Sequence, residues 1–176
     1  MKRAIVVLLT VLALTAWAED QATLTKSSSI PVPDGVVGPN EYQFNKTDSG
    51  MTVGATLGSD GMVYLAVQAK TTGWVALGVG GYKMDGSRLF LAYDTGKKRV
   101  FNEQIGKGHF HSDVKDPVVS KWAVKQADGV TTLELVLPEG AAVKDGSIDI
   151  LYAYSNSTIY MIPHKAKGVV SLKVSE

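Results

Sequence analysis

Apolar and polar residues alternate in short segments along most of the chain. In residues 131–137, for example, Leu133, Leu135 and Leu137 occupy every second position. A period of two is typical of a strand that buries one face. About nine segments are expected as strands on this ground. They are residues 51–57, 62–69, 73–79, 88–93, 98–102, 122–126, 131–137, 148–154 and 169–174.

Turn signals separate these segments. Asp-Gly pairs suit tight turns because Asp and Gly tolerate positive φ angles. They occur at Asp34-Gly35, Asp60-Gly61, Asp85-Gly86, Asp128-Gly129 and Asp145-Gly146. Short strands with short connections predict an all-β fold, an antiparallel β-sandwich of about nine to ten strands, without a convincing amphipathic helix. The longest irregular stretch is residues 103–120, and long loops on a β scaffold often carry functional sites.

The N-terminus has the make-up of a cleavable signal peptide. Two basic residues precede an apolar run over residues 4–14, and Ala16-Trp17-Ala18 fits a signal-peptidase site. The run is shorter than the roughly 18 residues that a bilayer span needs. We therefore expect a signal peptide at 1–18, a polar leader at 19–33 and one domain at 34–176. The protein is expected to be periplasmic or secreted, with no membrane span of its own.

Composition removes several functions. The chain has 18 basic and 17 acidic residues, and removal of residues 1–18 leaves 16 against 17, so nucleic acid is not an expected partner. It has no cysteine, which excludes disulfides, thiol nucleophiles, iron–sulfur clusters and covalently attached c-type haem. The motifs G-x-S-x-G and H-E-x-x-H and a phosphate-binding glycine loop are also missing. We expect a protein that is not an enzyme.

A family resemblance enters with residues 73–80, which read Gly-Trp-Val-Ala-Leu-Gly-Val-Gly, followed by Met84-Asp85-Gly86-Ser87. Together with Leu89 to Asp94, these residues resemble the signature of the DOMON family. Further similar pieces follow in the family's order, and the resemblance covers residues 34–174. They are Gly108-His109 with Asp116-Pro117, residues 129–138, and residues 164–168 before Val170-Ser171-Leu172.

The resemblance implies a β-sandwich that binds haem or, in relatives, sugars. Haem-binding members include the cytochrome domain of cellobiose dehydrogenase and the DOMON modules associated with cytochrome b561. In these members a Met after the Trp-bearing strand and a His before the last strand ligate a noncovalent haem b. Met84 and His164 stand at those two places. In another branch a lysine replaces the histidine, so Lys165 and Lys167 stay open as alternatives to His164.

The residues themselves leave simpler roles open. Met84 lies in a glycine-flanked loop, where a methionine often acts as flexible packing, and His164 follows Pro163, which stiffens the chain. Met161 is an alternative thioether ligand. Four aromatic residues could line a porphyrin, although core packing competes with that role for each. They are Trp74, Tyr82, Phe90 and Tyr160.

The function implied by a Met/His pair is electron transport. Thioether and imidazole are neutral ligands that raise the reduction potential of haem iron. Since both axial positions would be filled, substrate could not reach the iron. A separate redox partner is then expected, either a membrane cytochrome b561 or a periplasmic oxidoreductase.

Two other readings are kept. His109 and His111 would share one face of an extended segment and could bind copper or zinc, although no third strong ligand is obvious and an exposed polar loop is the simpler reading. The second function is a carbohydrate-binding-like module that uses exposed aromatics. Only Trp74 and Trp122 remain after residue 18, and Trp74 lies in an apolar strand, so a tryptophan platform has few candidates.

Overall fold

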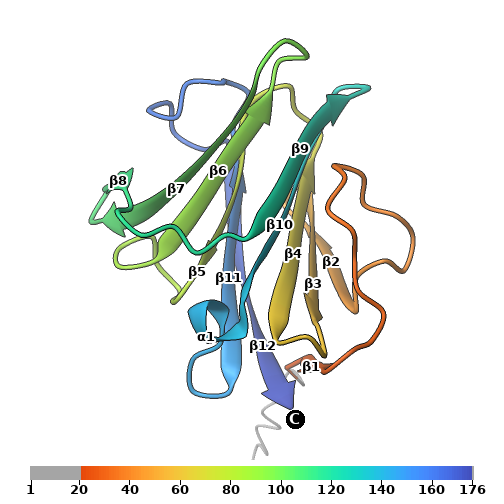
Figure 1. Ribbon diagram of the computed structural model, residues 1–176. Coiled ribbons are helices and arrows are strands. Elements are labelled where there is room, and N and C mark those ends of the chain that lie inside the picture. The colour runs from red at the N-terminus through yellow and green to blue at the C-terminus, as the bar shows by residue number, and fades with distance from the viewer. Residues whose placement is uncertain (1–20, 176) are drawn as a thin grey trace, which may run out of the picture.

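Two β-sheets packed face to face make up the computed structural model, which describes residues 21–175 (Figure 1). The expected β-sandwich is therefore confirmed. The expected signal peptide, residues 1–18, lies outside the described residues.

Seven strands form the larger sheet: β1 (Thr23–Thr25), β5 (Val75–Val79), β6 (Arg88–Asp94), β7 (Arg99–Lys107), β8 (Phe110–Asp113), β11 (Ser147–Tyr154) and β12 (Ala166–Ser175). Their order is β1-β12-β11-β5-β6-β7-β8. The smaller sheet contains β2 (Phe44–Asp48), β3 (Met51–Leu57), β4 (Met62–Ala69), β9 (Lys121–Ala127) and β10 (Val130–Pro138), in the order β2-β3-β4-β10-β9. One short helix, α1 (Glu139–Ala142), follows β10.

The core lies between the two sheets and is built from alternate residues of each strand. Leu133, Leu135 and Leu137 of β10 face Ile148 and Ile150 of β11 within one buried apolar cluster. Every second residue of a strand points to the same face, so the alternation seen in the sequence predicts which side chains enter this core.

The outer face of the five-stranded sheet is covered by the segment 31–42, which we call the N-terminal strap. Tyr42 of the strap packs with Tyr64, Ala66 and Val136 in a second buried cluster. The carboxylate of Glu134 in β10 accepts hydrogen bonds from the strap's backbone and from the Tyr42 hydroxyl. This sheet therefore has both faces covered.

The structure corrects the sequence analysis at several elements. The described residues contain twelve strands rather than nine to ten, because β1, β2 and β8 were not expected. Strand β1 belongs to the segment taken as a polar leader, and it pairs in parallel with β12. Most of the stretch 103–113, expected to be irregular, is the hairpin of β7 and β8. Residues 139–142 form a helical turn too short to show an apolar periodicity.

None of the helices found within residues 21–175 has the length and apolar character needed to cross a bilayer.

Candidate functional site

The outer face of the seven-stranded sheet is largely apolar along β5, β6 and β11, although a sandwich usually presents polar residues to water there. Strands β5, β6 and β11 alternate between core residues and outward residues, as their pairing registers require. The outward residues of these three strands are largely small or apolar, and we call this surface the apolar face. It comprises Ala76, Gly78, Leu89, Leu91, Tyr93, Leu151 and Ala153.

Small residues keep the middle of the apolar face low. A Cβ added at Gly78 would lie 3.0 Å from Leu89 Cδ2 and 3.2 Å from Leu151 Cβ, so the two leucines close over the glycine. Ala76 and Ala153 are direct partners in neighbouring strands. The middle of the apolar face therefore consists of small residues flanked by two leucines, an apolar surface that suits an apolar ligand.

Two loops border the apolar face from opposite ends of β5, as Figure 1 shows. Residues 80–87 connect β5 to β6 and carry Met84. Residues 155–165 connect β11 to β12 and carry His164. Because β5 and β11 are antiparallel, with Val79 opposite Ile150 and Val75 opposite Tyr154, the loop after β5 and the loop after β11 leave at opposite ends of the strands.

The Met84 loop is fixed by hydrogen bonds to the end of β7. Ser87 N donates to Met84 O at 3.0 Å, which closes a tight turn over Asp85 and Gly86. Gly86 N donates to Gly106 O at 3.0 Å, and Gly106 N donates to Ser87 O at 2.9 Å. The turn is therefore a continuation of the β6–β7 ladder, and Met84 is half-buried on it.

Tyr82, in the same loop, extends toward β12. Its hydroxyl lies 3.5 Å from Ser171 Oγ, although the side chain remains 64% exposed. Ser171 is the partner of Asp149 in β11, and both residues point outward. One carboxylate oxygen of Asp149 is buried without a hydrogen-bond partner among the described residues. The Met84 end of the apolar face thus combines an exposed phenol with an unpaired acceptor.

The loop 155–165 is tied at its root to the start of β5. Trp74 N donates to Ser157 O, and Ser155 N donates to Trp74 O, each at 2.9 Å. A Cβ on Gly73 would lie 2.2 Å from Ser155 O, so this close approach requires glycine. The Thr71 hydroxyl also donates to Ser155 O at 2.7 Å.

His164 lies between two anchored neighbours. The Ser155 hydroxyl donates to Pro163 O at 3.3 Å, and Lys165 N donates to Tyr154 O at 2.7 Å. The backbone is therefore held on both sides of His164, while its side chain is exposed. Such a residue can turn its imidazole toward a ligand without rearranging the sheet.

An aromatic group lies at the His164 end. Tyr93 and Tyr160 meet edge to face with ring centres 5.5 Å apart, and the Tyr160 hydroxyl donates to Leu91 O at 3.2 Å. Burial raises the pKa of Tyr160 above its ordinary value. Trp74 is 4% exposed but does not belong to either buried core cluster, and its Nε1 has no partner among the described residues.

Several large apolar side chains on or beside the two loops are exposed to solvent. They are Tyr82, Ile159, Met161, Ile162 and Val169. Clustered exposed apolar residues mark a binding surface more often than isolated ones do. Of the residues expected to line a porphyrin, Trp74 and Tyr160 lie at the His164 end of the apolar face, and Tyr82 lies in the loop at its Met84 end.

Phe90 lies elsewhere. It is fully buried between the sheets and stacks on Phe101, with ring centres 6.5 Å apart. Its neighbours Leu89 and Leu91 point to the opposite side of β6, so the strand's alternation separates Phe90 from the apolar face. Its place corresponds to the core-packing role that the sequence also allowed, and we leave it out of the candidate site.

The alternative ligands occupy different surroundings. Lys165 Nζ lies 6.0 Å from the centre of the Tyr154 ring. Lys167 is the partner of Ala153 and therefore points to the apolar face. Met161 is 75% exposed in the loop 155–165. Lys167 lies on β12, which borders the apolar face, whereas Lys165 and Met161 lie in the loop 155–165.

His109 lies in the turn between β7 and β8, and His111 lies in β8. His109 is exposed in the turn, whereas His111 pairs with Gly106 and its Nδ1 contacts Gln104 Oε1. Within residues 21–175, no group of three or more His, Asp or Glu residues is arranged to hold a metal ion.

A cavity lies at the flank of the sandwich, where β7 and β9 meet. It has a volume of about 380 Å³ and is lined by Phe101, Asn102, Glu103, Asp113, Val114, Pro117, Val119 and Trp122. Trp122 is 40% exposed and stacks on Phe101, with ring centres 4.9 Å apart. Neither Met84 nor His164 lines this cavity.

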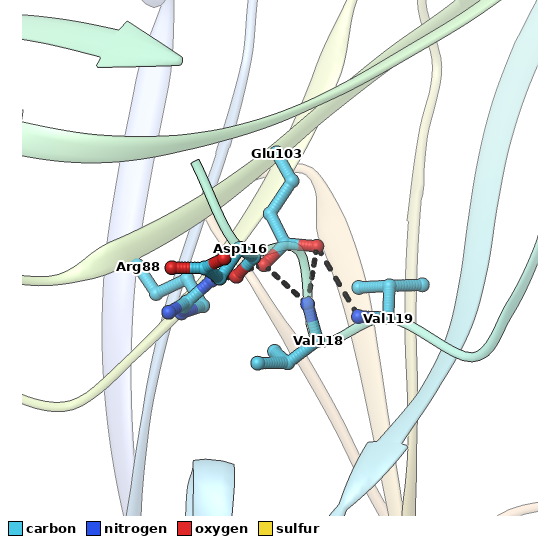
Figure 2. Close-up of polar contacts among 5 residues, drawn as sticks. All are labelled: Arg88, Glu103, Asp116, Val118 and Val119. Carbon is cyan, nitrogen blue, oxygen red and sulfur yellow. Dashed lines mark hydrogen bonds and ion pairs between the residues drawn. The ribbon is translucent and has the colours of Figure 1, made fainter. Parts of the chain in front are cut away.

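Glu103 fixes the segment 116–119, which contributes Pro117 and Val119 to the lining of this cavity. Figure 2 shows the polar contacts that hold this segment. The Glu103 carboxylate accepts hydrogen bonds from Val118 N at 2.9 Å and Val119 N at 3.2 Å, and it pairs with Arg88. The Arg88 guanidinium also donates to Asp116 O at 3.1 Å. All acceptor positions of Glu103 serve this bracing, so its role is structural.

Sequence reasoning missed two residues that shape the site. Gly106 allows the Met84 turn to lie directly on β7. Ser155 follows the end of β11 and connects the start of β5 to the His164 loop through hydrogen bonds to Trp74 O and Pro163 O. The repeated glycine in Gly106-Lys107-Gly108 is a weak signal for the first. No sequence pattern points to Ser155.

The site combines a half-buried apolar sheet face with a half-buried thioether, Met84, on a loop at one end. On the loop at the other end lies an exposed imidazole, His164, whose two neighbours in the chain are held by hydrogen bonds. The buried, unpartnered N–H of Trp74 adds a donor that an oxygen of a bound group could satisfy.

Comparison with known proteins shows a likeness of fold. No family model and no curated protein matches the sequence. Among solved structures, the cytochrome b domain of pyranose dehydrogenase from Coprinopsis cinerea matches with a TM-score of 0.58 at 12% identity, over 74% of this chain and 80% of that one. The cytochrome domain of Myriococcum thermophilum cellobiose dehydrogenase matches with a TM-score of 0.57 at 12% identity, over 75% and 81%. The chain shares the fold of these cytochrome domains, which confirms the DOMON resemblance at the level of fold.

Proposed function

We propose that this protein is an exported, noncovalent haem b domain that carries electrons, with Met84 and His164 as the axial ligands of the iron. The observation that supports it best is that the loops of both residues border one half-buried apolar sheet face. The fold is shared with two domains that are named cytochrome domains.

The residues around the face have separable roles in this proposal. Ala76 and Ala153 contribute short side chains to the face, and Leu89 and Leu151 close over Gly78. Trp74 and Tyr160 enclose the group at the His164 end, and Tyr82 covers it at the Met84 end. Lys167 is the alternative to His164, because it points to the same face.

The bound group would supply reversible one-electron chemistry. Neutral thioether and imidazole ligands favour the reduced iron, and the apolar surroundings do so as well. With both axial positions held by protein side chains, the domain has no place for a substrate at the iron. Its task is then to exchange electrons with a separate redox protein, either a membrane cytochrome b561 or a periplasmic oxidoreductase.

The test is the visible spectrum of the protein purified with haem supplied. The wild-type protein should show a Soret band, and its α band should sharpen on reduction with dithionite. Met84→Leu and His164→Ala should each change the spectrum to that of a haem that has lost one axial ligand.

Matched controls are available for both ligands. Met161→Leu and His109→Ala alter an exposed thioether and an exposed imidazole outside the proposed pair, so both should keep the wild-type spectrum. Absence of a Soret band in the wild-type protein contradicts the proposal. An unchanged spectrum in both Met84→Leu and His164→Ala contradicts the ligand assignment.

The second candidate function, a carbohydrate-binding-like module, is favoured by one observation. The flank cavity presents the exposed ring of Trp122, and the polar residues Asn102 and Asp113 also line it; an aromatic ring with nearby polar groups suits a sugar ring. If this function holds, calorimetry with oligosaccharides should show binding that Trp122→Ala abolishes. If no oligosaccharide of a broad panel produces heat of binding, the carbohydrate-binding function is contradicted.

A further inference from the structure

We propose that Gly106 of β7 is the positioning residue for Met84, because its missing side chain lets the Met84 turn lie directly on the sheet. The effect of Gly106 on thioether ligation of a haem rests on the proposed function. The contact between Gly106 and the Met84 turn does not depend on it, because it involves only residues of this chain.

The contact between the two residues involves backbone atoms. A Cβ built on Gly106 would lie 1.8 Å from Met84 O, 2.6 Å from Met84 C and 3.2 Å from Met84 Cγ. Real Cβ atoms stay at least about 3 Å from such neighbours, so the Met84 carbonyl would have to move by more than about 1 Å. A flexible side chain could swing away, whereas a hydrogen-bonded turn must shift as a unit.

The backbone conformation of Gly106 does not itself require glycine. Its φ lies outside the positive region, in contrast to Gly86 and Gly108. Alanine at position 106 is therefore compatible with the strand's dihedral angles. What a substitution changes is the space between β7 and the Met84 turn.

The direction of the contact places Met84 on the side of the sheet that carries the apolar face. Gly106 and Gln104 share one side of β7, and Gln104 is the partner of Leu89, which points outward. The missing Cβ of Gly106 therefore points outward as well, and Met84 lies over it. Displacing the turn would move the thioether away from this position.

The turn is held in this place by a second contact with the same hairpin. Gly108 N donates to the Asp85 carboxylate at 2.7 Å. Asp85 precedes the Gly86 N–H that bonds to Gly106 O. Gly106 and Gly108 thus fix the turn together. A side chain that ligates a metal has to be held within about half an ångström of its productive position.

The experiment compares Gly106→Ala with Gly140→Ala. Gly140 has no atom within 4 Å of an added Cβ and no positive φ, so its alanine variant controls for the added methyl group. The first readout uses haem-free protein treated with dilute hydrogen peroxide. Oxidation of Met84 to the sulfoxide is followed by peptide mass spectrometry and divided by that of Met161, which is 75% exposed.

In Gly106→Ala the Met84 to Met161 oxidation ratio should rise several-fold, because the half-buried thioether loses its contact with β7. In Gly140→Ala the ratio should equal that of the wild type. Asp85→Ala is the second variant, should Gly106→Ala fail to fold, and it should raise the ratio in the same direction. A wild-type ratio in folded Gly106→Ala overturns the inference, as does a wild-type ratio in Asp85→Ala if only that variant folds.

The second readout uses haem-loaded protein. Gly106→Ala should show weakened thioether ligation and should bind carbon monoxide in the ferrous state more readily than wild type. Wild-type protein that takes up no haem contradicts the proposed function, whereas the oxidation ratio still tests the role of Gly106. If Met84→Leu changes the haem spectrum but Gly106→Ala leaves both spectrum and ratio unchanged, the proposed function stands and this inference is wrong.

Discussion

At the scale of single residues, Tyr152 connects the turn between β2 and β3 to the seven-stranded sheet. Its buried hydroxyl donates to Asp48 Oδ2 at 3.0 Å. This hydrogen bond is made to the charged carboxylate, so it lowers the pKa of Asp48 below its ordinary value. Burial, together with the same contact, raises the pKa of Tyr152 to about 12.

Tyr152→Phe should therefore raise the pKa of Asp48 toward its ordinary value, as followed by NMR titration of the carboxyl carbon. A carboxyl whose pKa is lowered by folding stabilises the fold above its unfolded pKa of about 3.9, and that contribution is lost as pH falls through the folded pKa. The free energy of unfolding of Tyr152→Phe should therefore fall less steeply with acidification over this pH range than that of the wild type.

Tyr154→Phe is the matched control, since Tyr154 lies two residues further along β11 and its hydroxyl has no hydrogen bond to Asp48. It should leave the titration of Asp48 at the wild-type position. Equal Asp48 titrations in wild type and Tyr152→Phe would show that the hydrogen bond does not set this pKa.

At the scale of elements, the two sheets have their outer faces covered in different ways. The five-stranded sheet is covered by the N-terminal strap, which Glu134 holds through Gly35 N at 2.7 Å, Asp34 N at 3.0 Å and Val36 N at 3.2 Å. The Tyr42 hydroxyl adds a fourth donor at 2.7 Å. The seven-stranded sheet is bordered by two loops that leave large apolar side chains exposed.

Glu134→Ala should lower the free energy of unfolding by roughly 2–4 kcal/mol, because several buried donors lose their shared acceptor. Urea unfolding measures this change, and hydrogen exchange should show faster exchange in residues 34–42. Glu139→Ala is the control, since no hydrogen bond of the described residues involves the Glu139 side chain; it should be near neutral. Wild-type stability in Glu134→Ala would mean that the strap is held mainly by Tyr42 packing.

Several of the strands that could be predicted from the sequence have a regular alternation of apolar and polar residues, and the strands that were missed lack it. Strand β10 buries alternate leucines, so its period of two was visible. Strands β2 and β8 have almost entirely exposed side chains, and an edge strand with polar residues carries no such period. Strand β1 pairs with residues about 150 positions away, and local patterns cannot predict such a pairing.

At the scale of the whole molecule, the fold and the two candidate ligands were accessible by resemblance, whereas their supports were not. Met84 and His164 stand at matching places in a familiar order of motifs. Gly106 acts by letting the Met84 turn approach β7 closely. Ser155 acts through its hydrogen bond to Pro163 O in the loop that follows β11. Such contacts follow from the tertiary structure, and no local pattern of residue types reports them.

Residues 21–175 therefore combine a braced scaffold with one half-buried apolar face. The strap, the core and the Glu103 brace fix the scaffold. The unpartnered Trp74 Nε1 lies at one end of the apolar face, and the loops beside the face carry exposed apolar residues. A bound haem could accept a hydrogen bond from Trp74 Nε1 through an oxygen and would cover these apolar residues, which is the central claim of the proposed function.

The most direct test of that claim is the near-infrared magnetic circular dichroism spectrum of the haem-loaded ferric protein, because this spectrum distinguishes pairs of axial ligands. We predict a low-spin thioether–imidazole spectrum that is lost in both Met84→Leu and His164→Ala. A thioether–amine spectrum would move the second ligand to Lys167. A bis-imidazole or high-spin spectrum, or protein that holds no haem, would contradict the account.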